Sequence, residues 1–91
     1  MKIEFDPDKD TANFEKHGVS LAFGMQVFAD VDVLDLPTFR PEDDERRFKA
    51  IGMVGQRLWT AVYVERGDAI RLISVRRSNA SEERSYHRHP G

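Results

Sequence analysis

The alternation of polar and apolar residues at 2–5 predicts a short first strand. A helix is predicted next, because Asp6 is a favourable N-cap and Pro7 suits the first helical position, where its missing N–H is not needed. This helix should end at His17, since Gly18 is a favourable residue just past a helix C-terminus.

A second helix is predicted from Ser20, as its N-cap, to about Ala29. A strand is expected at 31–36, broken by Pro37. The stretch 37–45 contains two prolines and a run of four acidic residues, so it is predicted to be an exposed loop.

Three further strands are predicted in close succession, at 46–54, 58–65 and 69–77. The segments between them are tight turns that each contain a glycine. Such short connections leave no room for a crossover, so these strands must pair in antiparallel fashion.

Asn79 and Glu82 have the spacing of a capping box and predict a last helix at about 80–88, which is almost wholly polar. The predicted order is β-α-α-β-β-β-β-α. It indicates an α+β fold, with a small antiparallel sheet, helices packed on one side and a polar C-terminal helix.

Composition narrows the class of protein. The chain has 91 residues, enough for one domain, and its 40% hydrophobic and 33% charged residues support a modest core under a charged surface. The absence of cysteine excludes disulfides and thiolate metal sites. No apolar run resembles a signal peptide or a membrane span, so a soluble cytoplasmic protein is expected.

The charges are distributed unevenly. Residues 1–45 carry 4 Lys/Arg and 12 Asp/Glu, whereas residues 46–91 carry 10 Lys/Arg and 4 Asp/Glu. Two interpretations remain open at this point. Either the two halves form opposed faces, one of them attractive to phosphate, or they interleave and their charges cancel locally.

The first helix carries a polar stripe, because Lys9, Asn13 and His17 follow one another at intervals of four residues. The helix C-terminus is expected to raise the pKa of His17. His17 then has two candidate roles. It is either a C-terminal cap or, with Lys9 and Asn13, a general acid/base or phosphate contact.

Arginines gather in and after the last strand: Arg71, Arg76, Arg77 and Arg84. Strict alternation places Ser74 and Arg76 on the face of Leu72. It places Arg71 and Arg77 on the other face, with Val75. Arg76, at the strand end, is a candidate for bidentate binding of an RNA phosphate. The alternative is a salt bridge to Glu65 or to an acid of the first half.

Glu65 ends the middle strand, across a hairpin from the arginines. It is a candidate general base, with the anchoring of an arginine as the alternative. His87 and His89 form a His-x-His pair without an obvious third ligand, so neither a metal nor a cofactor is expected.

Motifs at both ends of the chain resemble those of the BrnT toxin family. The motif residues are 5–9, Asn13 and 16–20 near the N-terminus, and 71–77, 83–84 and Tyr86 near the C-terminus. The departures are mild, with Val75 in place of a usual alanine and Leu72 in place of a usual isoleucine.

This resemblance implies a toxin of a type II toxin–antitoxin system, with a RelE-like fold, that cleaves RNA without a metal and blocks translation. The implied partner is a BrnA-type ribbon-helix-helix antitoxin. The antitoxin would bind operator DNA, and an antitoxin dimer would carry the toxins in a heterotetramer.

Such cleavage uses the RNA 2′-OH as nucleophile and needs a base, cations for the phosphate and an acid for the leaving oxygen. The hypothesis assigns the phosphate to Arg76 with Arg71 or Arg77, and proton transfer to Glu65 or His17. Further candidates for RNA binding are Lys9, Arg84 and Tyr86. The competing hypothesis is a non-catalytic or degenerate module that binds an antitoxin or nucleic acid.

Overall fold

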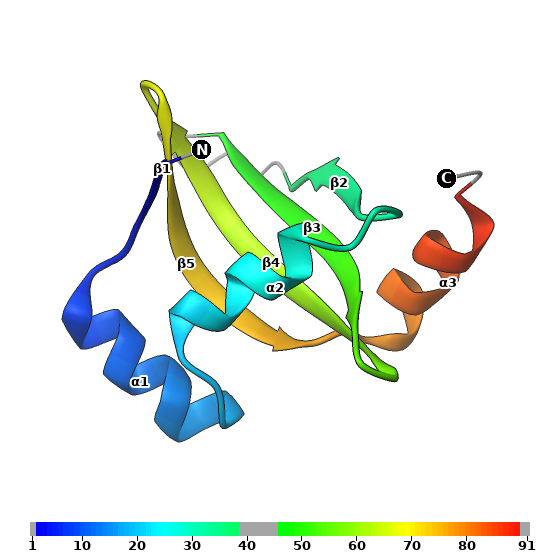
Figure 1. Cartoon of the computed structure of the whole chain (residues 1–91), viewed down its shortest axis with the longest axis horizontal. Coiled ribbons are helices and arrows are strands. Elements are labelled where there is room, and N and C mark those ends of the chain that lie inside the picture. The colour runs from blue at the N-terminus through cyan, green and yellow to red at the C-terminus, as the bar shows by residue number, and fades with distance from the viewer. Residues whose placement is uncertain (1, 39–45, 90–91) are drawn as a thin grey trace.

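The computed structural model describes residues 2–38 and 46–89 of the chain. The acidic run at 42–45 lies outside the described residues. The elements are β1 (Lys2–Glu4), α1 (Pro7–His17), the 3₁₀ helix η1 (Leu21–Phe23), α2 (Gly24–Phe28), β2 (Leu34–Pro37), β3 (Arg47–Val54), β4 (Arg57–Arg66), β5 (Ala69–Arg77) and α3 (Ala80–Arg88) (Figure 1).

The strands form one sheet in the order β1-β5-β4-β3-β2. The two hairpins are antiparallel as predicted, and Gly55 and Gly67 turn them with positive φ angles of 64° and 61°. The prediction of a wholly antiparallel sheet was wrong, because β1 pairs with β5 in parallel. Residues 5–68 lie between these two strands, so no short turn dictates their direction.

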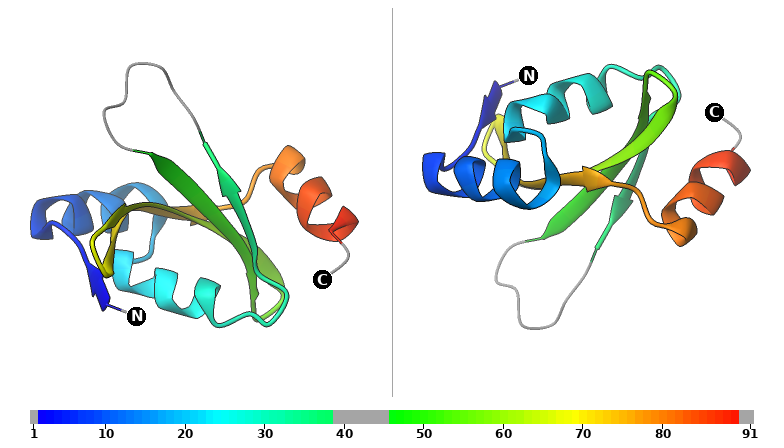
Figure 2. Two further views of the ribbon diagram at one scale, coloured as in Figure 1. Left: turned by 90° about the horizontal axis from the view of Figure 1, so that it is seen from above. Right: turned by 90° about the horizontal axis from the view of Figure 1, so that it is seen from below.

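The sheet separates the helices. α1 and α2 lie on one side and α3 lies on the other (Figure 2). The main core fills the side of α1 and α2, and its buried residues are Leu21, Val27, Ala50, Ala61, Tyr63, Ile70, Leu72 and Val75. None of the described helices has the length and apolar character needed to cross a membrane.

Two predicted elements differ in detail. The second helix is split into η1 and the short α2, and the Ser20 side chain makes no capping hydrogen bond. The strand expected at 31–36 begins later and ends later, as β2 (Leu34–Pro37). Val31 is almost fully exposed, and pairing with β3 begins only at Leu34. Pro37 belongs to this strand, which is acceptable at a sheet edge, where its missing N–H breaks no ladder bond.

The ends of α1 are as predicted. The Asp8 N–H donates to the Asp6 carboxylate at 2.8 Å, and Gly18 ends the helix at φ 80° with its N–H donating to the Phe14 carbonyl at 2.9 Å.

Gly18→Ala is expected to lower the free energy of unfolding by about 1 kcal/mol, because an L-residue is strained in the left-handed region. A Cβ at Gly18 would meet nothing within 4 Å, so the cost should come from the backbone alone. Urea denaturation measures it. A loss above about 3 kcal/mol would contradict this explanation.

Candidate functional site

A β-bulge in β5 decides which side chains reach the site. Val62 pairs with Ser74 and Tyr63 with Leu72, so Ile73 is an extra residue without its own partner on β4. Leu72 and Val75 therefore both point into the core and are fully buried. The prediction from strict alternation was wrong from Ser74 onward, because Ser74 and Arg76 lie on the face away from the core.

This second face of the sheet carries cations. Residues directly opposite on neighbouring strands point to the same side. Lys49 of β3 thus shares a face with Val62 and Ser74. Arg76 lies opposite Thr60, two residues beyond Ser74 on β5, and therefore on the same face.

Asn13 joins α1 to the edge of β5. Its amide Nδ2 donates to the carbonyl oxygens of Val19 and Val75, both at 2.9 Å, and its Oδ1 accepts the Val75 N–H at 3.0 Å. The side-chain amide thus replaces a strand neighbour at the point where β1 has already ended. Asn13 is only 5% exposed, so its role is to hold α1 against β5.

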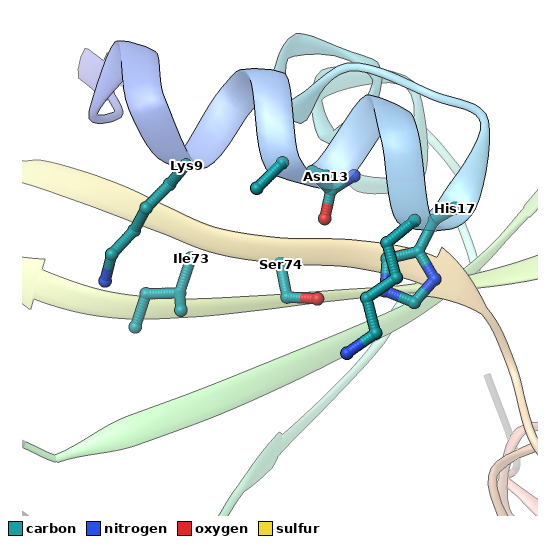
Figure 3. A pocket seen from close by; sticks show the side chains of 7 residues that line it. Lys9, Asn13, His17, Ile73 and Ser74 are labelled. Atoms are coloured by element: carbon teal, nitrogen blue, oxygen red, sulfur yellow. The ribbon is translucent and has the colours of Figure 1, made fainter.

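A small pocket of about 190 Å³ lies between α1 and β5 (Figure 3). Its lining consists of Lys9, Ala12, Asn13, Lys16, His17, Ile73 and Ser74. The polar stripe predicted on the first helix therefore faces the bulge of β5. The lining has no acidic residue. The pocket is smaller than the roughly 300 Å³ at which drug-sized ligand sites begin, and suits a compact anionic group.

Partial burial and the nearby positive charges of Lys16 and Arg76 lower the pKa of His17 below its ordinary value of 6.5. The prediction that the helix C-terminus raises the pKa of His17 was therefore wrong. Desolvation and two cations outweigh the helix C-terminus. His17 is then mostly neutral at pH 7, which a general base requires.

Glu82 of α3 is the centre of a buried polar network on the second face. Arg76 donates to its two carboxylate oxygens through Nη1 at 2.7 Å and Nη2 at 2.8 Å. Lys49 Nζ lies 3.1 Å from Oε2. The Thr60 hydroxyl, at 3.0 Å, and the Asn79 N–H, at 2.9 Å, both donate to Oε1.

These donors hold the pKa of Glu82 at about 2 despite burial, which acts in the opposite direction. A pKa below the ordinary 4.5 means that the charge stabilises the fold fully above pH 4.5. That contribution is lost as the pH falls toward 2. Glu82 also completes the capping box predicted with Asn79.

Of the other predicted residues, only Arg71 shares the face of Arg76, and it forms an exposed ion pair of 3.5 Å with Glu4. Arg77 lies on the opposite face, 5.7 Å from the Trp59 ring centroid. Arg84 is exposed on α3.

The Tyr86 hydroxyl donates to Asp30 at 2.6 Å, and this bond raises the pKa of Tyr86 to about 12. Tyr86 therefore ties α3 to the segment before β2. A hydroxyl with that pKa is a poor proton donor at pH 7.

Glu65 is not among the residues that line the pocket. It lies opposite Ile70 at one end of β4, whereas Arg76 lies opposite Thr60, five residues along the strand. At about 3.3 Å per residue these positions are roughly 16 Å apart. The suggested salt bridge of Arg76 to Glu65 or to an acid of the first half is wrong, because the partner is Glu82.

Two residues of the site were missed by sequence reasoning, Lys49 as a cation and Glu82 as the partner of Arg76. The sequence contained a signal only for Glu82, as the acidic residue of the capping box with Asn79. Among the residues that the structure describes, no three His, Asp or Glu side chains are grouped as metal ligands.

A search of curated proteins finds no significant match to the chain. A family profile described as the ribonuclease toxin BrnT of type II toxin–antitoxin systems matches residues 5–82. That match spans most of the chain and includes α1, the bulge of β5, Arg76 and Glu82. The chain therefore belongs to the BrnT family of ribonuclease toxins of type II toxin–antitoxin systems.

Proposed function

We propose that this chain is a metal-independent endoribonuclease whose active site is the pocket between α1 and β5. The observation that carries the proposal is the pocket itself, where a histidine with a lowered pKa lies among cations and no acid. A site of this charge attracts a phosphodiester, and a neutral imidazole within it is suited to proton transfer.

In the proposed reaction, His17 takes the proton of the RNA 2′-OH. The 2′-oxygen attacks phosphorus, the bond from phosphorus to the 5′-oxygen breaks, and the leaving oxygen takes a proton from a lysine ammonium, Lys9 or Lys16. The products are a 2′,3′-cyclic phosphate and a 5′-OH end.

Arg76 is proposed to bind the non-bridging phosphate oxygens, where negative charge grows in the transition state. Arg76 is not among the residues that line the pocket, but its positive charge contributes to the lowered pKa of His17, which supports a shared role. Arg71 is proposed as a more distant contact with the RNA backbone, since it shares this face of the sheet.

The proposal extends to the cell and to the partner. Cleavage of RNA would stop translation, and a BrnA-type ribbon-helix-helix antitoxin would neutralise the toxin in a heterotetramer that binds operator DNA through the antitoxin. Family membership supports an antitoxin partner. Co-expression followed by mass measurement of the purified complex tests the stoichiometry.

The central test incubates the purified chain with end-labelled RNA in excess EDTA. We expect cleavage that leaves 2′,3′-cyclic phosphate ends and that stops when the nucleotide at the cut carries a 2′-deoxy sugar. Binding of RNA without cleavage by the folded protein would favour the non-catalytic module instead. Cleavage that disappears in EDTA would contradict metal independence.

His17→Gln is expected to reduce kcat/KM for RNA by about 100-fold, because a positioned general base contributes at least this much. In the wild type, kcat/KM should rise with pH through a midpoint below 6.5, where His17 loses its proton. The variant His17→Gln should lack this acidic limb, that is, the rise of kcat/KM with pH.

The matched control is His87→Gln, which removes an exposed histidine of α3. It should keep both the rate and the pH profile. An unchanged acidic limb in His17→Gln would exclude His17 as the base.

A further inference from the structure

We propose that Glu82 is a positioning residue for the cleavage reaction, which holds the Arg76 guanidinium so that its free edge receives the scissile phosphate. This inference rests on the proposed function. It assigns to α3 a part in the active site that neither the charge pattern nor the family description records.

The first support is the saturation of the Glu82 carboxylate. Its side chain is only 1% exposed, and five donors from Arg76, Lys49, Thr60 and the Asn79 backbone reach its two oxygens. A carboxylate offers about four lone-pair positions, so none is left for a substrate. Glu82 therefore acts on RNA only through the groups it holds.

The second support is the way Arg76 is held. Nη1 and Nη2 donate to the two Glu82 oxygens, and Nη1 also donates to the Arg77 carbonyl at 3.3 Å. Within the described part of the chain, Nε–H and the second Nη2–H have no partner. These two N–H groups lie on one edge of the guanidinium and form a fork that matches two phosphate oxygens.

The third support is rigidity. Glu82 belongs to the capping box in the first turn of α3, and its hydrogen bond to Thr60 ties it to the middle of the sheet. The side chain is thus fixed from both the helix and the sheet. An arginine that is oriented before substrate arrives loses little conformational freedom when phosphate binds.

Glu82→Gln tests this arrangement, because the amide keeps the shape and removes the charge and one acceptor oxygen. Its NH₂ group would face the donors of Arg76 or Lys49, so Arg76 should lose its fixed orientation. We expect kcat to fall by about 100-fold, the loss typical of a misplaced catalytic group.

A double-mutant cycle with Arg76→Lys separates positioning from general damage. If Glu82 acts through the Arg76 fork, Glu82→Gln should lower kcat no more than about threefold when Arg76 is already lysine. Losses that multiply, or full activity of Glu82→Gln, would overturn the inference.

Thr60→Val provides a variant for the case that Glu82→Gln does not fold. It removes the hydrogen bonds of the Thr60 hydroxyl to Glu82 Oε1 and to the Ser78 hydroxyl, and it keeps every charge. We expect a fall in kcat of about tenfold, with little further loss in the Arg76→Lys background. Equal losses in both backgrounds would count against positioning.

A spectroscopic measurement on the full chain separates this inference from the proposed function. The Arg76 Nε–H should give a distinct NMR signal that shifts when inorganic phosphate is added. In Thr60→Val or Glu82→Gln, this signal should merge with those of exposed arginines. An unchanged signal in the variants would refute positioning even if the wild type cleaves RNA. A wild type that cleaves no RNA would refute the proposed function, and the role of Glu82 in cleavage with it, even if the signal behaves as expected.

Discussion

Arg76→Lys is expected to lower the rate of RNA cleavage by roughly 100- to 1000-fold, the loss seen when a preorganised donor to a transition-state oxyanion is removed. Lysine keeps the positive charge beside Glu82 but has no second, parallel N–H for the phosphate. The loss should appear mainly in kcat, because charge develops on the phosphate oxygens during the reaction. Single-turnover cleavage of labelled RNA measures it.

Lys2→Ala is the control for a general effect of the cations of the sheet, because it removes a positive charge far from the proposed site. Lys2 is exposed on β1 and lies opposite Ala69, at the end of β5 away from Arg76. It should cleave at the wild-type rate. A rate for Arg76→Lys within threefold of wild type would show that the charge alone suffices, and that the bidentate fork of Arg76 has no role.

Local signals in the sequence accounted well for α1 and its place in the site. Asp6, Pro7 and Gly18 act at short range, so their conformational preferences determined where the helix begins and ends. The spacing of Lys9, Asn13 and His17 likewise determines a shared helix face, and all three line the pocket.

The bulge at Ile73 explains why the last strand was less predictable. One extra residue moves Ser74 and Arg76 to the other face, and nothing in the residue types marks the position as a bulge. The pairing between β4 and β5 determines it, and this pairing depends on packing across the whole sheet.

The partner of Arg76 was also missed, although Glu82 is only six residues away in the chain. Glu82 lies in a helix of mostly polar residues, which is typical of an exposed element, yet its side chain is fully buried. Besides Arg76 and Asn79, its carboxylate contacts Lys49 and Thr60, which are 33 and 22 residues away in the chain. Interactions at such separation leave no periodic pattern in the sequence.

Asn13→Ala is expected to lower the free energy of unfolding by about 3 kcal/mol, the upper part of the range for stranding buried hydrogen-bonding groups. Alanine would leave the Val75 N–H and the carbonyls of Val19 and Val75 without their present partner. The midpoint of thermal unfolding should fall on the order of 15 °C for a domain of this size. Glu15→Ala, on the exposed side of the same helix, should change it little.

Asn13→Asp distinguishes lost hydrogen bonds from lost packing, because aspartate has nearly the shape of asparagine. A carboxylate oxygen in place of Nδ2 would face the carbonyl oxygens of Val19 and Val75, so the folded state should raise the pKa of the new carboxyl. The variant should be most stable at low pH and lose stability as the pH rises through that pKa. Stability of Asn13→Asp equal to wild type at pH 7 would show that the Asn13 amide does not hold α1 against β5.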